Sequence, residues 1–249
     1  MDIQDSSIKT GGSVLHSCFF ILWAIVSSTL YGTVCMALTL FSKDTARRLA
    51  QLWNIHLLGI GGIKVKITGK DKLSPDKRYV FISNHQSALD IPVLYSSLHH
   101  ALSFIAKKEL FMIPVFGWGM AAVGHIWIDR KNARKAHASI KRAVTKLKRE
   151  NISLILFPEG TRSKDGNVGD FKSGSFSLAI EAGVEVVPVA ISNASQRLPR
   201  KSIRVIPGEV SLDIGDPIAV SELKEKSKAE LCAHIHQLIK TMAEKTTAS

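Results

Sequence analysis

The sequence has 249 residues and a mass of 27.3 kDa, which allows one substantial hydrophobic core and excludes two large domains. Hydrophobic residues make up 45% of the chain and charged residues 22%, a composition that excludes a wholly disordered or collagen-like protein. Lys and Arg outnumber Asp and Glu by 33 to 21, so the formal net charge is +12. A chain this basic predicts an anionic partner: a phosphate-bearing substrate, an acidic lipid or nucleic acid.

The first predicted element is a long apolar segment over residues 14–41, inside a stretch without any Asp, Glu, Lys or Arg. As one helix it would be about 42 Å long at ~1.5 Å per residue, which exceeds the ~30 Å hydrocarbon core of a bilayer. Lys43, Arg47 and Arg48 follow it, and positive residues beside an apolar helix tend to stay in the cytoplasm. The sequence therefore predicts a membrane-associated segment, with the rest of the chain on the cytoplasmic side.

A second interpretation of this region is a pair of helices that dips into one leaflet without crossing the membrane. The middle of the segment, residues 27–29 with Gly32, is polar enough to bend. Apolar residues then recur at helical spacing from Leu49 to Ile60, so a second helix could pack beside the first in the membrane interface. A third interpretation is a buried core helix of a soluble protein, against which the length of the run argues.

Beyond residue 62, short runs rich in β-branched residues alternate with helical patterns. This alternation predicts an α/β fold with a mixed, mostly parallel sheet flanked by helices. We divide the chain into an N-terminal membrane-associated helical segment, residues 1–62, and a main domain, residues 63–249. Strands are predicted over residues 78–83, 102–106, 125–128, 153–157, 184–192 and 202–214. Helices are predicted over residues 88–98, 115–123, 132–149, 174–182 and 221–245, with Ser221 as the N-cap of the last.

Chemically versatile side chains follow the first predicted strand, where Asn84 and His85 precede Asp90. Open α/β sheets place ligand sites at the carboxyl ends of their strands. A carboxylate next to the imidazole could fix its tautomer and stabilise the imidazolium formed when it accepts a proton. The alternative is structural, because Ser87-x-x-Asp90 is also the pattern of a helix capping box.

A second group of polar residues follows the predicted strand 153–157. Gly160 allows a close backbone approach, Arg162 offers a fork of donors suited to phosphate, and Thr161 adds a hydroxyl. The alternative is an ordinary turn with a solvated arginine. Charged residues also follow the predicted strand 102–106, in residues 106–110, and end the block 124–130, in which the strand 125–128 lies, so several strand ends could converge on one site.

Four blocks in order resemble the 1-acylglycerol-3-phosphate acyltransferase family of bacterial type, the lysophosphatidate acyltransferases. Together with a linking Phe171-Lys172-x-Gly174 they cover residues 84–191, and the ordered set is highly specific to the family. The blocks are Asn84-His85-x4-Asp90, residues 124–130 (GHIWIDR), residues 157–163 (FPEGTRS) and residues 187–191 (VPVAI).

The resemblance implies a role for each matching residue. His85 corresponds to the general base and Asp90 to its partner. The glycerophosphate-binding block is Glu159, Gly160, Thr161 and Arg162; Lys107 corresponds to a second phosphate contact, and Arg130 helps to shape the same pocket.

The resemblance also implies the reaction and its partners. A fatty acyl group would pass from an acyl thioester, on coenzyme A or acyl carrier protein, to the sn-2 hydroxyl of lysophosphatidate, forming phosphatidate. We expect membrane lipids as partners, no nucleic acid, no metal ion and no bound cofactor, at the cytoplasmic face of the inner membrane. Two alternatives stay open: an acyltransferase for another lysophospholipid or lipid acceptor, and a non-catalytic basic module that binds acidic membranes.

Overall fold

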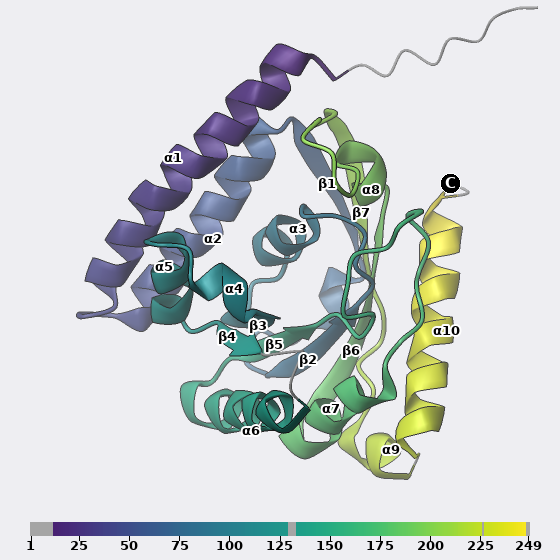
Figure 1. Ribbon diagram of the computed structural model, residues 1–249. Helices are drawn as coiled ribbons and strands as arrows, with labels where there is room; N and C mark the ends of the chain where they lie inside the picture. Colours follow the sequence, from purple (N-terminus) through teal and green to yellow (C-terminus); the bar gives the residue numbers. More distant parts are fainter. Residues whose placement is uncertain (1–11, 129–132, 226, 248–249) are drawn as a thin grey trace, which may run out of the picture.

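The structure is a computed structural model that describes residues 12–128, 133–225 and 227–247 (Figure 1). Two helices open the described chain, and strands then alternate with helices. The strands are β1 Ile63–Thr68, β2 Tyr79–Ser83, β3 Leu102–Lys107, β4 Ile126–Ile128, β5 Ser153–Leu156, β6 Glu185–Ser192 and β7 Gly208–Ile214. The helices are α1 Val14–Leu38, α2 Lys43–Ile60, α3 Asp90–Ser97, α4 Lys108–Phe111, α5 Phe116–Val123, α6 Ala133–Glu150, α7 Phe176–Ala182, α8 Ala194–Arg197, α9 Val220–Glu225 and α10 Lys228–Thr247, with 3-10 turns at Lys70–Lys72 and Ser173–Ser175.

The strands of the described chain form one seven-stranded sheet in the order β1-β7-β6-β2-β5-β3-β4. β6 and β7 run antiparallel, whereas every other pair of neighbours is parallel. The predicted mixed, mostly parallel sheet flanked by helices is therefore confirmed. Because β2 and β5 are parallel neighbours at the centre, the turns that follow them leave the sheet at the same edge.

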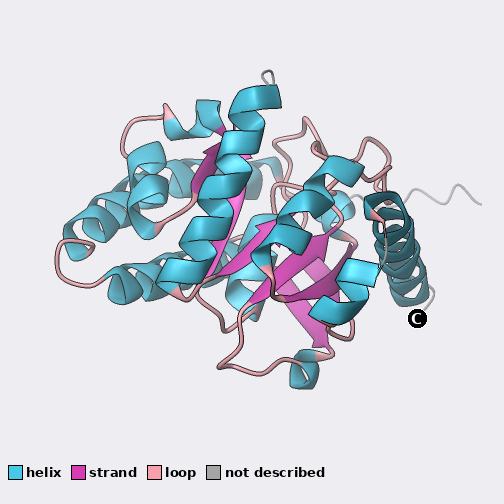
Figure 2. Ribbon diagram, turned by 90° about the horizontal axis from the view of Figure 1, so that it is seen from below, coloured by secondary structure: helices cyan, strands magenta, loops and turns pink. Residues whose placement is uncertain are grey.

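Helices cover both faces of the sheet, and each face has its own hydrophobic core (Figures 1 and 2). Phe81 of β2 joins the core under α1, α2 and α3, whereas its neighbours Val80 and Ile82 join the core under α6, α7 and α10. Successive side chains of a strand point to opposite faces, so a strand buried on both faces needs a continuous apolar run. This requirement explains why Tyr79–Ser83 contains no charged residue.

The N-terminal region is a pair of antiparallel helices, α1 and α2, that pack along each other (Figure 1). The apolar segment forms one helix, as predicted, but α1 ends at Leu38 rather than at residue 41, and the chain then reverses before α2. Ser42 begins the second helix, since its hydroxyl oxygen accepts a hydrogen bond from the backbone N–H of Thr45 at 3.2 Å. The pairing of two helices is therefore present, whereas the dip of this pair into one leaflet stays a prediction.

The predicted strand over residues 202–214 is wrong in its first half. Only β7 is a strand there, and the chain between α8 and β7 is a loop in which Ile206 N donates to Arg197 O at 2.8 Å. Pro207 has no N–H to contribute to a strand ladder, so the strand begins after it.

One strand was not predicted at all. In β1, Ile63 is buried and Val65 and Ile67 are half-buried, whereas the intervening Lys64 and Lys66 are exposed. This alternation is the pattern of a strand with one solvated face, and exposed lysines are common on an edge strand.

The closing helix predicted over residues 221–245 is two helices. Ser227 N donates to Glu230 Oε2 at 2.8 Å, and Glu230 N donates to Ser227 Oγ at 3.2 Å. This reciprocal capping box begins α10 at Lys228. Ser221 lies inside α9, which begins at Val220, rather than at an N-cap.

Candidate active site

Two turns meet at the carboxyl ends of β2 and β5. Ser163 N donates to His85 O at 2.7 Å, and His85 N donates to Glu159 Oε1 at 2.9 Å. The side chain of Asn84 fixes the first turn to β6, because it donates to Ile191 O and accepts from Ile191 N, both at 2.8 Å. The strand order thus joins two of the motifs predicted from the sequence into one site.

His85 and Asp90 form a hydrogen-bonded pair, with 2.6 Å between Nδ1 and Oδ2. Asp90 is fully buried, and the same Oδ2 accepts the backbone N–H groups of Gln86 at 2.7 Å and Ser87 at 2.9 Å. An oxygen that accepts two N–H groups is an acceptor for the ring as well, which assigns the proton to Nδ1 and leaves a lone pair on Nε2. The His85 ring also stacks on Phe157, with 4.2 Å between centroids.

Asp90 therefore combines the two roles that the sequence offered as alternatives. It satisfies the backbone of the turn, as in a capping box, and it orients the imidazole. The Ser87 hydroxyl is engaged elsewhere: it donates to Leu198 O at 2.8 Å and accepts from Leu89 N at 3.2 Å. This arrangement is that of a histidine base without an adjacent serine nucleophile.

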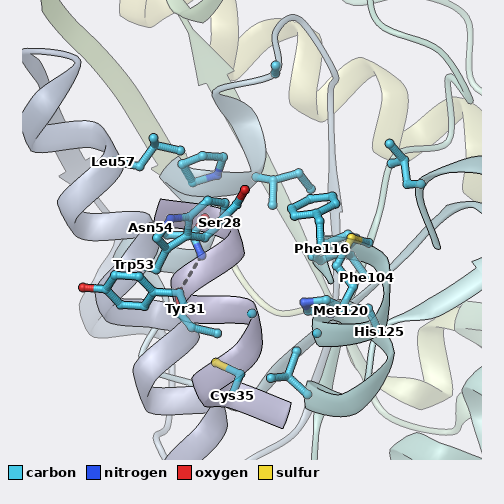
Figure 3. Close-up of a pocket in the computed structure, with 18 of the residues that line it drawn as sticks. Ser28, Tyr31, Cys35, Trp53, Asn54, Leu57, Phe104, Phe116, Met120 and His125 are labelled. Carbon is cyan, nitrogen blue, oxygen red and sulfur yellow. Dashed lines mark hydrogen bonds between the residues drawn. The ribbon is translucent and has the colours of Figure 1, made fainter. Parts of the chain in front are cut away.

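His85 and Arg162 line the same cavity, which has a volume of about 360 Å³. The rest of its wall is mostly apolar and comes from α1, α2, α3 and α5 together with β3 (Figure 3). A histidine and an arginine beside a mostly apolar space suit a ligand with a reactive polar group and a hydrocarbon chain. Side chains from both walls include Trp53, Leu57, Phe104, Phe116, Met120 and Val123.

The turn that carries Arg162 needs a glycine. Gly160 has φ +74°, in the left-handed region, and a Cβ at this position would lie 3.2 Å from Lys172 Nζ. The backbone carbonyl of Arg162 accepts from Arg200 Nη1 at 2.8 Å, which holds the turn from the other side. The Arg162 guanidinium itself is exposed and makes no ion pair with any residue that the structure describes.

Comparison with known proteins agrees with this geometry. A family model described as Acyltransferase matches residues 64–192. The 1-acyl-sn-glycerol-3-phosphate acyltransferase of Salmonella typhimurium is 31% identical, over 89% of this chain and 90% of that one. The chain belongs to this acyltransferase family. The resemblance seen in the sequence is thereby confirmed, and the protein is an enzyme.

Two further relatives extend the comparison of this acyltransferase. The chloroplastic 1-acyl-sn-glycerol-3-phosphate acyltransferase LPAT1 of Arabidopsis thaliana is 40% identical over 62% of this chain, which spans only 44% of that longer protein. The crystal structure of the 1-acyl-sn-glycerophosphate acyltransferase PlsC from Thermotoga maritima superposes with a TM-score of 0.82 at 28% identity, covering 95% of this chain and 96% of that one. The fold of the acyltransferase, including its two N-terminal helices, is thus found in a solved structure.

The other predicted binding residues of the acyltransferase differ in their placement. Lys107 ends β3, on the strand next to β5, and is exposed, as is Thr161. Arg130 lies outside the described residues. Lys172, which the sequence showed only as part of a linking pattern, lies against the Gly160 turn and adds a cation there. Contact of these residues with substrate stays a prediction.

The N-terminal helices contribute to the cavity, which the sequence did not predict. Tyr31, Gly32 and Cys35 of α1 and Trp53 and Asn54 of α2 line it, although the sequence suggested only membrane association for this region. The sequences of α1 and α2 around these positions are mostly apolar with some small residues, and such a pattern is equally typical of helices that simply pack against a core. No signal in the sequence distinguishes a helix face that closes a cavity from one that fills a core. Among the residues that the structure describes, no group of His, Cys, Asp or Glu side chains is arranged to hold a metal ion.

Glu159 is buried and faces the main chain. Its carboxylate accepts from His85 N, and a second hydrogen bond comes from the backbone of Gly169. Burial raises the pKa of this carboxyl to about 7, and the negative charge of Asp90 adds to the effect. A buried carboxylate between two loops positions the His85 turn, so we assign Glu159 this positioning role; its predicted contact with the glycerophosphate stays a prediction.

The pKa of Glu159 predicts that the folded state loses stability as the pH rises. In the unfolded chain the carboxyl titrates near 4.5, so between pH 4.5 and 7 the folded state binds more protons, and the free energy of unfolding falls with pH. The loss amounts to at most about 3 kcal/mol. Glu159→Gln should remove this loss. The difference in the free energy of unfolding between the variant and wild type should therefore shift in favour of the variant from pH 5 to pH 8. Urea unfolding in detergent at both pH values measures this difference.

The control for this measurement is the exposed carboxyl of Glu209. Glu209→Gln makes the same chemical change at an exposed position. The free energy of unfolding of this variant should depend on pH as that of wild type does. Identical pH dependence in wild type and Glu159→Gln would show that this carboxyl does not carry a raised pKa.

Proposed function

We propose that this acyltransferase transfers a fatty acyl group from an acyl thioester to the sn-2 hydroxyl of lysophosphatidate and so forms phosphatidate. The observation that carries the proposal is the shared cavity of His85 and Arg162. It brings a proton acceptor and a phosphate-binding cation to one apolar space. The relatives from Salmonella typhimurium and Thermotoga maritima, named for this acceptor, support it.

His85 supplies the proton transfer in this mechanism. Nε2 accepts the proton of the sn-2 hydroxyl while the oxygen attacks the thioester carbonyl carbon. The tetrahedral intermediate then collapses, the carbon–sulfur bond breaks, and the leaving thiolate takes the proton back from the imidazolium. The negative charge of Asp90, 2.6 Å from Nδ1, stabilises the imidazolium between the two steps. Coenzyme A and acyl carrier protein both present such a thioester, and either fits this chemistry.

The polar and apolar parts of the substrate would bind in different parts of the cavity. The glycerol phosphate would bind at the mouth, where Arg162 provides donors for a phosphate monoester, with Lys172 against the Gly160 turn and Lys107 at the end of β3 as further cations. An acyl chain would extend into the apolar part between α2 and α5, where each buried methylene stabilises the complex. A non-catalytic basic module would need neither the buried His85–Asp90 pair nor this cavity.

The exposed side of α1 supports association with a membrane. Side chains that α1 buries against the protein include Ser17 and Ser27, whereas Leu15, Leu22 and Leu30 are 81%, 62% and 62% exposed. A helix that leaves several large apolar side chains uncovered suits hydrocarbon as solvent. α1 is long and apolar enough to cross a bilayer, but it packs along α2 and α5 for much of its length. We therefore place it within one leaflet, at the cytoplasmic face of the inner membrane.

Arg162→Ala tests the acceptor. Loss of a charged donor to a phosphate monoester costs about 1.5–3 kcal/mol, so the KM for lysophosphatidate should rise roughly 10- to 100-fold while kcat changes less. The assay uses purified enzyme in phosphatidylcholine vesicles with lysophosphatidate and either acyl-coenzyme A or acyl carrier protein as donor. Arg162→Lys, which keeps the charge but loses the fork, should lie between wild type and the alanine variant.

Arg149 provides the matched control, because its side chain is 75% exposed on α6. Arg149→Ala should leave the KM unchanged. If lysophosphatidate were not acylated, while a lysophospholipid with a phosphate diester were, the acceptor would be another lipid. An unchanged KM in Arg162→Ala would show that Arg162 does not contact the phosphate of the acceptor.

A further inference from the structure

The peptide group between Arg162 and Ser163 is held at both of its ends. Its N–H donates to His85 O at 2.7 Å, and its carbonyl oxygen accepts from Arg200 Nη1 at 2.8 Å. Because a peptide group is planar, hydrogen bonds at its two ends fix its orientation. This peptide directly follows the Cα of Arg162, so its orientation constrains the direction in which the Arg162 side chain leaves the turn.

Arg200 reaches this carbonyl from a turn that follows α8. Ser202 N donates to Pro199 O at 3.0 Å, which closes a turn with Arg200 and Lys201 at its centre. The proline fixes its own φ at the start of the turn. Lys201 has φ +64°, in the left-handed region, which is unfavourable for a residue with a long side chain. The turn thus holds Arg200 at one place although its backbone conformation is locally unfavourable.

The same loop also contacts the turn that carries His85. Leu198 lies two residues before Arg200, and its carbonyl oxygen accepts from the Ser87 hydroxyl at 2.8 Å. Ser87 belongs to the His85 turn, in which its own N–H is held by a buried carboxylate. Residues 198–200 therefore bridge the two turns of the candidate site, with one hydrogen bond to each.

The outer part of this loop is anchored against the start of α1. Val205 is fully buried, and its N–H donates to Ser17 Oγ at 3.0 Å. Arg204 Nε donates to Gly12 O at 3.0 Å. The inner end of the loop is held by α8, since Leu198 N donates to Ala194 O at 3.0 Å. With both ends held, the loop gives the turn between them a fixed base.

The guanidinium of Arg200 brings a positive charge to the Arg162 carbonyl. Arg200 is half-buried and forms no ion pair within the part of the chain that the structure describes. A charged donor makes a stronger hydrogen bond to a carbonyl than a neutral one does. It also polarises the peptide, so that the N–H at the other end becomes a better donor to His85 O. One guanidinium therefore strengthens the connection between the two turns.

We infer that Arg200 is a positioning residue, which holds Arg162 in the orientation that receives the phosphate of the acceptor. The inference rests on the proposed function and adds a residue that acts through Arg162 and does not itself contact the substrate. Recognition of a phosphate monoester by a guanidinium depends on the direction of its donors. Loss of Arg200 should therefore weaken binding of the acceptor, whereas proton transfer at His85 should proceed as before.

A double-mutant cycle tests this role. Arg200→Met keeps a long side chain but removes every donor, so the KM for lysophosphatidate should rise roughly three- to tenfold while kcat stays within about twofold. In the Arg162→Ala background the same change should not raise the KM further, because the group that Arg200 positions is already absent. Arg200→Lys, which keeps the charge and one donor, should restore part of the affinity. The assay varies lysophosphatidate in vesicles at a saturating concentration of the acyl donor.

Lys201→Asn is the matched control. It removes a positive charge from the same turn, and asparagine tolerates the left-handed region, so the hydrogen bond from Arg200 to the Arg162 carbonyl should persist. The KM of this variant should equal that of wild type. An unchanged KM in folded Arg200→Met would overturn the inference. It would also be overturned by an equal rise in Lys201→Asn, which shows an effect of charge, or by a further rise in the Arg162→Ala background, which shows direct contact with the phosphate.

Hydrogen exchange tests the same role without a measurement of activity. The Ser163 N–H should exchange roughly three- to tenfold faster in Arg200→Met, measured by mass spectrometry on a peptic fragment that covers residues 157–163. The N–H groups of residues 86–87, which the Asp90 carboxylate accepts, should exchange as in wild type. Equal exchange over residues 157–163 in the folded variant would overturn the inference. Absence of lysophosphatidate turnover in wild type would instead contradict the proposed function, and the exchange measurement would still decide whether Arg200 holds the turn.

Discussion

Replacement of His85 by alanine is expected to lower the rate of acyl transfer by about 10³-fold or more. Without the imidazole the sn-2 hydroxyl loses the proposed proton acceptor, and Asp90 cannot replace it because it is fully buried behind the ring. The fold should persist, because the His85 side chain is 20% exposed and its loss removes mainly the stack on Phe157, worth about 1 kcal/mol. Initial rates in vesicles and the thermal midpoint of unfolding measure the two effects separately.

His100 is the matched control for this variant. It is also a partly buried histidine, with Nε2 3.0 Å from Ser74 O, but it does not line the apolar cavity. His100→Gln should keep turnover within about twofold of wild type, since an exposed or half-buried substitution away from the site has a small effect. Near-normal turnover in folded His85→Ala would exclude the proposed base and the mechanism built on it.

Local sequence patterns predict the central strands of this acyltransferase well. β2, β5 and β6 are buried on both faces, so each is a short apolar run that ends at a polar turn. The errors fall where a weaker local signal decides the structure. The capping pattern Ser227-x-x-Glu230 divides the last helix, and Pro207 delays the start of β7. Both signals are present in the sequence, whereas the reversal after Leu38 depends on how α1 packs against α2.

The candidate site is predictable in part for a physical reason. His85 and Asp90 are close in sequence, and parallel neighbouring strands bring Arg162 to the same edge of the sheet. The wall that α1 and α2 provide is not predictable in this way, because a cavity between helices depends on which side chains fail to fill the space. The place of His125 in the cavity wall has the same origin: its sequence neighbours indicate a strand, and only the pairing of that strand with β3 brings it there.

Asp90→Asn should reduce turnover almost as strongly as loss of the imidazole, by about 10³- to 10⁴-fold, with little loss of stability. An asparagine oxygen can still accept the N–H groups of Gln86 and Ser87, so the turn is kept. The negative charge that stabilises the imidazolium is lost, and an amide turned the other way would donate to Nδ1 and impose the wrong tautomer on His85. Turnover at saturating substrate, together with the thermal midpoint, is the measurement.

Asp90→Ala separates the catalytic role of this carboxylate from its structural role. Truncation leaves two buried N–H groups without an acceptor, at about 1–3 kcal/mol each, so this variant should lose stability as well as activity. The carboxylate of Asp213 accepts a hydrogen bond from the Thr68 hydroxyl near the surface, and Asp213→Asn should change neither activity nor stability. If Asp90 served only the start of α3, Asp90→Asn would keep its turnover. The hydrogen bond to His85 therefore predicts a loss of activity without a loss of fold, and a purely structural cap predicts neither loss in this variant.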